Sequence, residues 1–281
     1  MAMLQKIITA VFLVSVLFLV AAMAGCGAKQ GSYQLSAAWC QEAANKITVM
    51  QPEEIPGSIA QEGMAKTGEE FDVNAYFQVL THLKIKKGYV LDYIYYLGAS
   101  GGTPVLYTRH TDQPSFRNYG DFAIAGTSVT RPENDVSLLW MTIEKGGTFK
   151  YGSQINVKDS AEGYYEYTLM QLLGGQFYLY YKANVYDVRV VATPAEAEKV
   201  LESIENADAN QIDDDFRKKA KALDLQPVVE IGHDAVKVSV VVFTMWGGFS
   251  RVTFTMGRNY PNSITQYDNN VILKYDSGVI L

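Results

Sequence analysis

The chemically most specific pattern in the sequence is a serine flanked by glycines. Residues 98–102 read Gly-Ala-Ser-Gly-Gly, which matches the G-x-S-x-G arrangement that exposes a nucleophilic serine between a strand and a helix. His233, later in the chain, could act as the base for Ser100. However, Pro104 would fall inside the helix that this motif requires, and residues 104–109 have the composition of a strand. We therefore expect a hairpin turn here and keep a serine hydrolase that uses Ser100 and His233 as the alternative function.

The other residue types that support catalysis or metal binding are spread along the chain. The three histidines and two cysteines show no spacing typical of a zinc, calcium or phosphate-binding motif. We therefore expect no cofactor and no metal site, and we favour a binding role over an enzymatic one. We expect His82 near the end of a helix, where a partly charged imidazole suits the helix dipole.

Tyrosines recur in short rows, and the sequence contains 19 of them. Tyr93, Tyr95, Tyr178 and Tyr180 fall on predicted strands. Exposed rows of this kind could stack on sugar rings or line a groove for a partner. Cross-strand packing in the core is the interpretation that we favour, so these four residues are weak candidates for binding.

The N-terminus has the order of parts found in a secretory signal. Lys6 precedes an uncharged apolar run from Ile7 to Val20, and small residues then lead to Cys26. The segment Met23-Ala24-Gly25-Cys26 resembles the lipobox of bacterial lipoproteins, although Leu is usual where Met23 stands. The resemblance is confined to this segment. It implies cleavage before Cys26 and attachment of fatty acyl chains such as palmitate, which would hold the protein to a membrane.

Two other interpretations of the N-terminus remain open. Ile7 to Gly25 is close to the roughly 20 residues that span a bilayer, and a plain signal peptide could end near a Cys by coincidence. The crowding of small residues favours lipidation, because a spanning helix more often stays Leu-rich and ends with Lys or Arg. Lipidation implies a place in the cell envelope facing away from the cytoplasm. Gly27, where an Asp commonly signals inner-membrane retention in such families, favours the outer membrane if the organism has one.

These features predict three parts: a signal peptide over 1–25, a tether over 26–34 that reaches at most ~30 Å, and an extracytoplasmic domain over 35–281 with a subdivision near 193–225. The formal net charge is −6, without a basic block. This argues against nucleic acid as a partner and against attraction to anionic headgroups. We expect the membrane as a partner through the lipid anchor, and an envelope protein or a glycan as a further partner. Cys40 is expected to be buried; the alternative is a reactive or intermolecular thiol.

Periodicity and turn residues predict an α+β fold with antiparallel sheets, interspersed amphipathic helices and a soluble mature part. Predicted helices lie over residues 37–49, 72–83, 161–173, 194–204 and 212–223, with a capping box at Thr193-Pro194-Ala195-Glu196. Predicted strands lie over residues 89–97, 104–109, 122–130, 136–143, 177–183, 185–192, 228–231, 235–246, 249–257, 271–275 and 279–281. Gly247-Gly248 is predicted as a two-residue hairpin turn.

Overall fold

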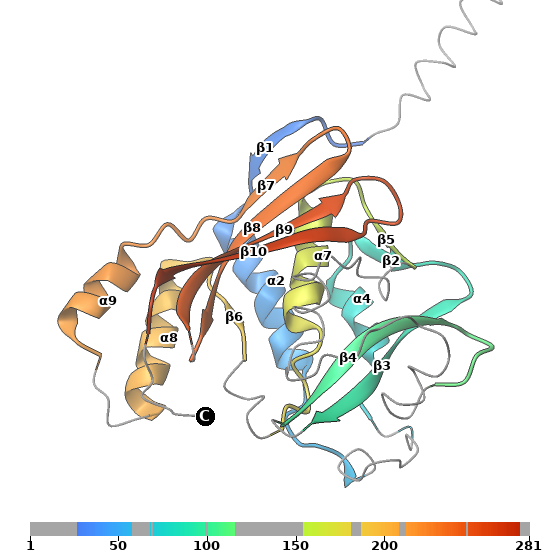
Figure 1. The fold of residues 1–281 in the computed structure, drawn as a ribbon, viewed down its shortest axis with the longest axis horizontal. Coiled ribbons are helices and arrows are strands. Elements are labelled where there is room, and N and C mark those ends of the chain that lie inside the picture. Colours follow the sequence, from blue (N-terminus) through green and yellow to red (C-terminus); the bar gives the residue numbers. More distant parts are fainter. Residues whose placement is uncertain are drawn as a thin grey trace, which may run out of the picture.

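The main sheet is antiparallel and has the strand order β1-β7-β8-β9-β10, with β6 beside β8 (Figure 1). The computed structural model describes residues 27–57, 68, 70–98, 101–115, 154–180, 187–207, 212–245 and 247–275. The strands are β1 (Gly31–Gln34), β6 (Arg189–Val190), β7 (Val228–Ile231), β8 (Ala235–Thr244), β9 (Gly248–Gly257) and β10 (Ile264–Leu273). The N-terminal strand thus pairs with a strand from the last third of the chain.

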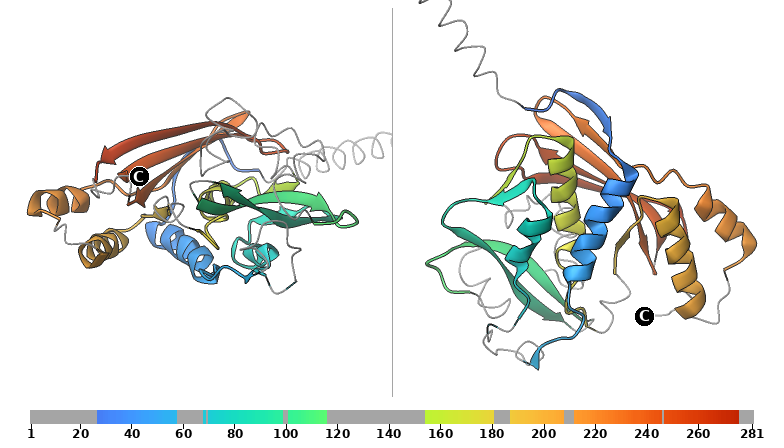
Figure 2. Two further views of the ribbon diagram at one scale, coloured as in Figure 1. Left: turned by 60° about the horizontal axis from the view of Figure 1, so that its bottom comes forward. Right: turned by 180° about the vertical axis from the view of Figure 1, so that it is seen from behind.

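Two helices cover one face of this sheet, α2 (Ala37–Met50) and α7 (Ala161–Leu173) (Figures 1 and 2). The hydroxyl of Ser36 accepts a hydrogen bond from the Trp39 N–H, as expected of an N-cap. Helix α7 is the central element, because it contacts α2, strands β7 and β8 of the main sheet, and both β2 and β5. All of its residues except Glu162 are buried. Burial on every side explains why α7 lacks a polar face.

The remaining strands form two small antiparallel sheets. One pairs β2 (Leu83–Ile85) with β5 (Ile155–Val157), and the other is the hairpin of β3 (Tyr89–Gly98) and β4 (Gly101–His110). Before them, η1 (Val73–Ala75) and α4 (Tyr76–Val79) form a short helical segment.

This short segment replaces the longer helix predicted over 72–83. Asp72 caps it by accepting from the Asn74 N–H at 3.0 Å, and Phe71 packs on Tyr76 with ring centroids 5.4 Å apart. Leu83 instead joins β2, because pairing with the distant β5 outweighs the local helical pattern.

Helices α8 (Pro194–Ala207) and α9 (Asp214–Lys221) pack at one end of the main sheet. One half of the predicted capping box is seen: the Thr193 hydroxyl accepts from the Glu196 N–H at 3.2 Å, while the Glu196 carboxylate pairs with Lys199 at 3.0 Å. The expected apolar face of α8 is buried against Phe243 and Phe249. Strands β8 and β9 therefore contribute to both hydrophobic clusters, the large one under α2 and α7 and the smaller one at α8.

The α+β class with antiparallel sheets is confirmed. Within the described ranges, no helix is both long and apolar enough to cross a bilayer. The strand predicted over 177–183 is reduced to a single bridge between Gly102 and Tyr180 before the described residues stop at 180. Of the strand predicted over 185–192, the described part (187–192) contains only β6. The strands predicted over 122–130, 136–143 and 279–281 lie outside the described residues.

Two predictions near the C-terminus are wrong. Thr244 pairs with Gly248, so three residues connect β8 and β9 instead of two. Gly248 has a φ of 80°, a conformation that glycine adopts without steric cost. The short strand predicted over residues 271–275 is instead the end of the ten-residue strand β10, which begins at Ile264 and includes Asn269 and Asn270.

Candidate functional site

The strand-to-helix turn required for a serine nucleophile is not formed. Gly98 pairs with Gly101, and strand β4 follows where the motif needs a helix. The expected hairpin is therefore confirmed, although Ser100 itself lies outside the described residues. The His233 side chain is 81% exposed in the β7–β8 turn, with Nδ1 2.7 Å from Asp234 Oδ1. That turn lies at the top of the molecule and the Gly98–Gly101 end of the hairpin lies low in it, both in Figure 1 and in the right-hand view of Figure 2.

Three of the four candidate binding tyrosines belong to the core. Tyr93, Tyr95 and Tyr178 are buried. Tyr93 and Tyr178 pack against Phe177, with ring centroids 4.9 and 5.1 Å apart, and the Tyr95 hydroxyl donates to the Tyr178 carbonyl at 2.7 Å. Burial raises the pKa of Tyr95 to about 12 and also raises the pKa of Tyr178. These three side chains therefore do not form an exposed surface on which a ligand could stack. They pack in the core, which is the interpretation that the sequence favours. Only Tyr180 among the four is exposed, at 53%.

Cys40 is fully buried in α2, as expected. Its burial raises the pKa of the thiol to about 12, although the Tyr165 hydroxyl opposes this shift. A thiol with this pKa stays protonated at neutral pH and is a poor nucleophile.

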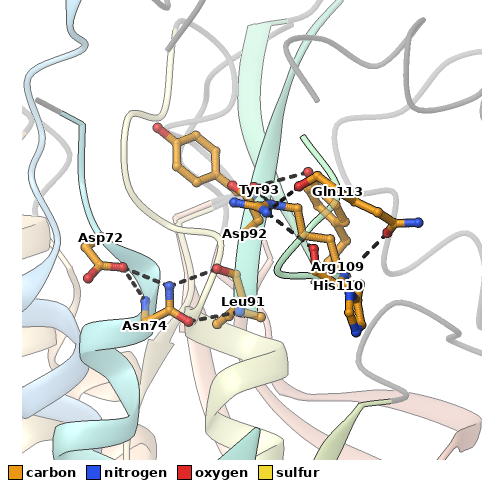
Figure 3. Close-up of polar contacts among 9 residues, drawn as sticks. Asp72, Asn74, Leu91, Asp92, Tyr93, Arg109, His110 and Gln113 are labelled. Carbon is orange, nitrogen blue, oxygen red and sulfur yellow. Dashed lines mark hydrogen bonds and ion pairs between the residues drawn. The ribbon is translucent and has the colours of Figure 1, made fainter. Parts of the chain in front are cut away.

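A polar network on the β3–β4 hairpin surrounds a buried carboxylate (Figure 3). Asp92 is 8% exposed, and its Oδ2 accepts from Arg109 Nε at 2.6 Å and from the Tyr107 hydroxyl at 3.2 Å. Arg109 also donates to the backbone carbonyl of Gln113 at 2.6 Å. The arginine thus balances a buried charge and ties the chain after β4 to the hairpin, so a structural role accounts for these contacts.

A second buried carboxylate holds the turn before β2. Glu166 in α7 accepts the His82 N–H at 2.7 Å, and its other oxygen lies 2.7 Å from His82 Nδ1. The expected role of His82 at a helix C-terminus is therefore wrong, because the helix ends earlier and the imidazole pairs with a carboxylate.

A third polar cluster holds Ala28, which lies near the start of the described residues. We call it the N-terminal clamp; it consists of Ala28, Asp159, Tyr164, Gly232 and Arg258. Ala28 donates its N–H to the Asp159 carbonyl at 3.1 Å, and its own carbonyl accepts from Arg258. The Arg258 guanidinium also donates to both Asp159 carboxylate oxygens, at 3.1 and 2.9 Å, and to the Gly232 carbonyl at 2.9 Å. The side chain of Arg258 is therefore hydrogen-bonded to the segment at Ala28, to Asp159 just before α7, and to the β7–β8 turn.

Electrostatics stabilise the N-terminal clamp. Burial alone would raise the pKa of Asp159, but hydrogen bonds from Arg258 and from the Tyr164 hydroxyl, the latter at 2.7 Å, hold it below its usual value of 3.8. Gly27 passes so close that a Cβ there would collide with the Asp159 carboxylate. The clamp therefore favours the smallest residue at position 27.

The expected tether over 26–34 is not a flexible spacer in its described part. Gly31 to Gln34 form β1 and pair with β7 in register from Gly31–Ile231 to Gln34–Val228. Together with Ala28, this pairing makes the N-terminal segment part of the domain. Cys26, the expected lipid attachment site, lies just outside the described residues.

Nothing in the local sequence indicates the N-terminal clamp, because its members come from four separate segments. Among the residues described, no group of three or more His, Cys, Asp or Glu side chains is arranged to hold a metal ion. Comparisons with protein families, curated proteins and solved structures found no match.

Proposed function

We propose that this chain is a bacterial envelope lipoprotein, attached to a membrane through acyl chains on Cys26, whose α+β domain acts as a binding or assembly module at the membrane surface. The observation that carries the proposal is the position of the N-terminal clamp. Among the described residues, Ala28 already makes contacts with the fold, two residues after the expected lipidated cysteine. Cleavage of the signal peptide between Gly25 and Cys26 would leave this domain intact.

The acyl chains provide the membrane affinity in this proposal. Each buried methylene contributes about 0.8 kcal/mol, so two chains are enough for stable anchoring. The domain would then sit directly on the membrane, because β1 and the N-terminal clamp leave no long spacer.

The experiment for lipidation is intact-mass measurement of the protein purified from its own membranes. We expect a mass that corresponds to residues 26–281 plus two or three acyl chains. Cys26→Ala should abolish acylation, whereas Cys40→Ala should leave it unchanged because that thiol is buried. An unacylated protein, or one that retains residues 1–25, contradicts the proposal.

Among the strands that the structure describes, β10 forms one edge of the main sheet, and this exposed edge supports an assembly role. β10 pairs with β9 on one side, and residues 265–271 are largely exposed, with Val271 at 50%. An edge strand offers backbone donors and acceptors to a strand of a partner protein.

Site-specific photo-crosslinking in intact cells tests the assembly role. A photo-reactive residue in place of Val271 should capture an envelope protein, whereas the same residue in place of Glu202 on the exposed side of α8 should not. Equal crosslinking at the two positions, or none at position 271, argues against β10 as the assembly edge.

A further inference from the structure

We propose that the edge of the molecule beside the N-terminal clamp docks onto anionic lipid headgroups. This inference rests on the proposed lipid anchor and adds which face of the domain meets the membrane. We call this surface the basic edge and define it by Lys29, Lys86, Lys87, Lys158 and Tyr260.

The fold brings the basic edge together from separate segments. Lys29 follows Ala28 of the N-terminal clamp, and Lys158 precedes Asp159 of the same clamp. Tyr260 lies two residues after Arg258 in the β9–β10 turn, and its hydroxyl donates to Gln154 Oε1 at 3.0 Å.

The turn between β2 and β3 joins the same edge. The Lys86 N–H donates to the Gln154 carbonyl at 2.9 Å, and the Lys86 ammonium lies 5.9 Å from the Tyr260 ring centroid. Lys86 also lies 5.7 Å from the Tyr89 ring centroid. The lysine and the exposed tyrosine are therefore neighbours, in the arrangement of a cation beside an aromatic face.

The charge of this edge is opposite in sign to that of the whole protein. All four lysines are exposed, and so is Tyr260, at 47%. Among the described residues, Asp112 and Asp234 are exposed acids beside the edge, while the Asp159 carboxylate is balanced by Arg258. The edge therefore carries a positive balance on a chain whose net charge is −6.

The position of the anchor identifies the surface that this edge faces. Cys26 is two residues from Ala28, a separation of at most about 7 Å in a fully extended chain. Acyl chains on Cys26 would hold the N-terminal clamp near the headgroups, and the basic edge adjoins that clamp. Ammonium groups attract anionic headgroups, and a tyrosine ring is well suited to the boundary between polar and apolar layers.

Lipid-dependent quenching of a single dye tests this orientation. The acylated protein is reconstituted in mixed vesicles of phosphatidylcholine and phosphatidylglycerol whose chains are brominated. A dye is attached to Asn259→Cys in the β9–β10 turn or, as control, to Glu202→Cys on α8. Helix α8 lies away from the β9–β10 turn in Figure 1, and buried Cys40 does not compete for the dye. We expect quenching at position 259 and much less at position 202.

Charge variants show whether the lysines cause the docking. Each lysine near an anionic surface contributes about fivefold to the docking equilibrium, so Lys86→Gln/Lys87→Gln should lower the ratio of docked to undocked protein by about 25-fold. Lys199→Gln/Lys218→Gln removes the same charge from α8 and α9 and should leave quenching at position 259 unchanged. In vesicles of phosphatidylcholine alone, quenching of the wild-type protein at position 259 should fall as it does for Lys86→Gln/Lys87→Gln in the mixed vesicles.

The outcomes separate this inference from the proposed function. Equal quenching at positions 259 and 202 of a vesicle-bound, acylated protein overturns the orientation and leaves the lipid anchor standing. Quenching at position 259 that is insensitive to Lys86→Gln/Lys87→Gln overturns the role of the basic edge. A purified protein without acyl chains overturns both proposals.

Discussion

The Nδ1 atom of His82 lies 2.7 Å from the Oε1 atom of Glu166, a side chain that is 2% exposed in the middle of α7. The second carboxylate oxygen accepts the backbone N–H of His82. One buried side chain therefore fixes both the imidazole and the backbone of the turn that leads into β2.

Replacing Glu166 should destabilise the protein to a degree that depends on the substitute. Glu166→Ala removes both contacts and leaves the His82 N–H without its acceptor, so we expect a loss of about 2–4 kcal/mol in the free energy of unfolding. Glu166→Gln retains an acceptor oxygen and should cost less. Urea unfolding at pH 7 measures both. If the two variants are equally stable, the carboxylate does not hold the turn.

The N-terminal clamp should make stability depend on pH in the acid range. The pKa of Asp159 is lower in the folded protein than its usual value of 3.8, so its contribution is present above that value and is lost as the pH falls through the folded pKa. At pH values below about 4, the urea midpoint of the wild-type protein should therefore fall more steeply with decreasing pH than the midpoint of Asp159→Asn. Parallel curves for the two proteins would show that another group dominates.

Cys40 should be inert in the folded protein. Because burial raises the pKa of its thiol to about 12, a maleimide at pH 8 should not modify the Cys26→Ala variant until the protein unfolds. Mass spectrometry with and without urea gives the answer. Rapid modification without urea would mean that α2 opens readily.

The hairpin network predicts a large effect at Arg109. Arg109→Ala removes the cation that balances buried Asp92, and breaking a buried ion pair in this way costs about 3–5 kcal/mol. The double variant Arg109→Ala/Asp92→Asn should recover part of this loss, because the uncompensated charge is gone. The test is a double-mutant cycle in urea, and additive losses would argue against coupling between the two side chains.

Local signals predicted much of the secondary structure. Ser36 and Thr193 place the starts of α2 and α8 correctly, because cap residues act within one turn of the chain. The hairpin of β3 and β4 was also predictable from the sequence, because two segments with the composition of strands flank a glycine-rich turn. Each of these features depends on residues that are close in sequence.

Features that depend on distant contacts were not predictable from one sequence. The local pattern around Leu83 predicts a helix, but this residue pairs with Val157 in β5. Asn269 was not predicted to lie in a strand, but it belongs to the exposed strand β10. The N-terminal clamp needs Asp159 and Arg258 to meet Ala28, and nothing in the local sequence at Ala28 indicates these partners. The tyrosines illustrate a further limit, because an alternating strand pattern does not reveal that both faces of β3 are covered.

The pairing of β1 with β7 has a consequence for the order in which the protein can be built. Gly31 is among the first residues of the domain to leave the ribosome, yet its partner Ile231 is made after most of the chain. Strand β1 therefore has no partner, and the main sheet cannot close, until synthesis has passed β7, which delays completion of the fold.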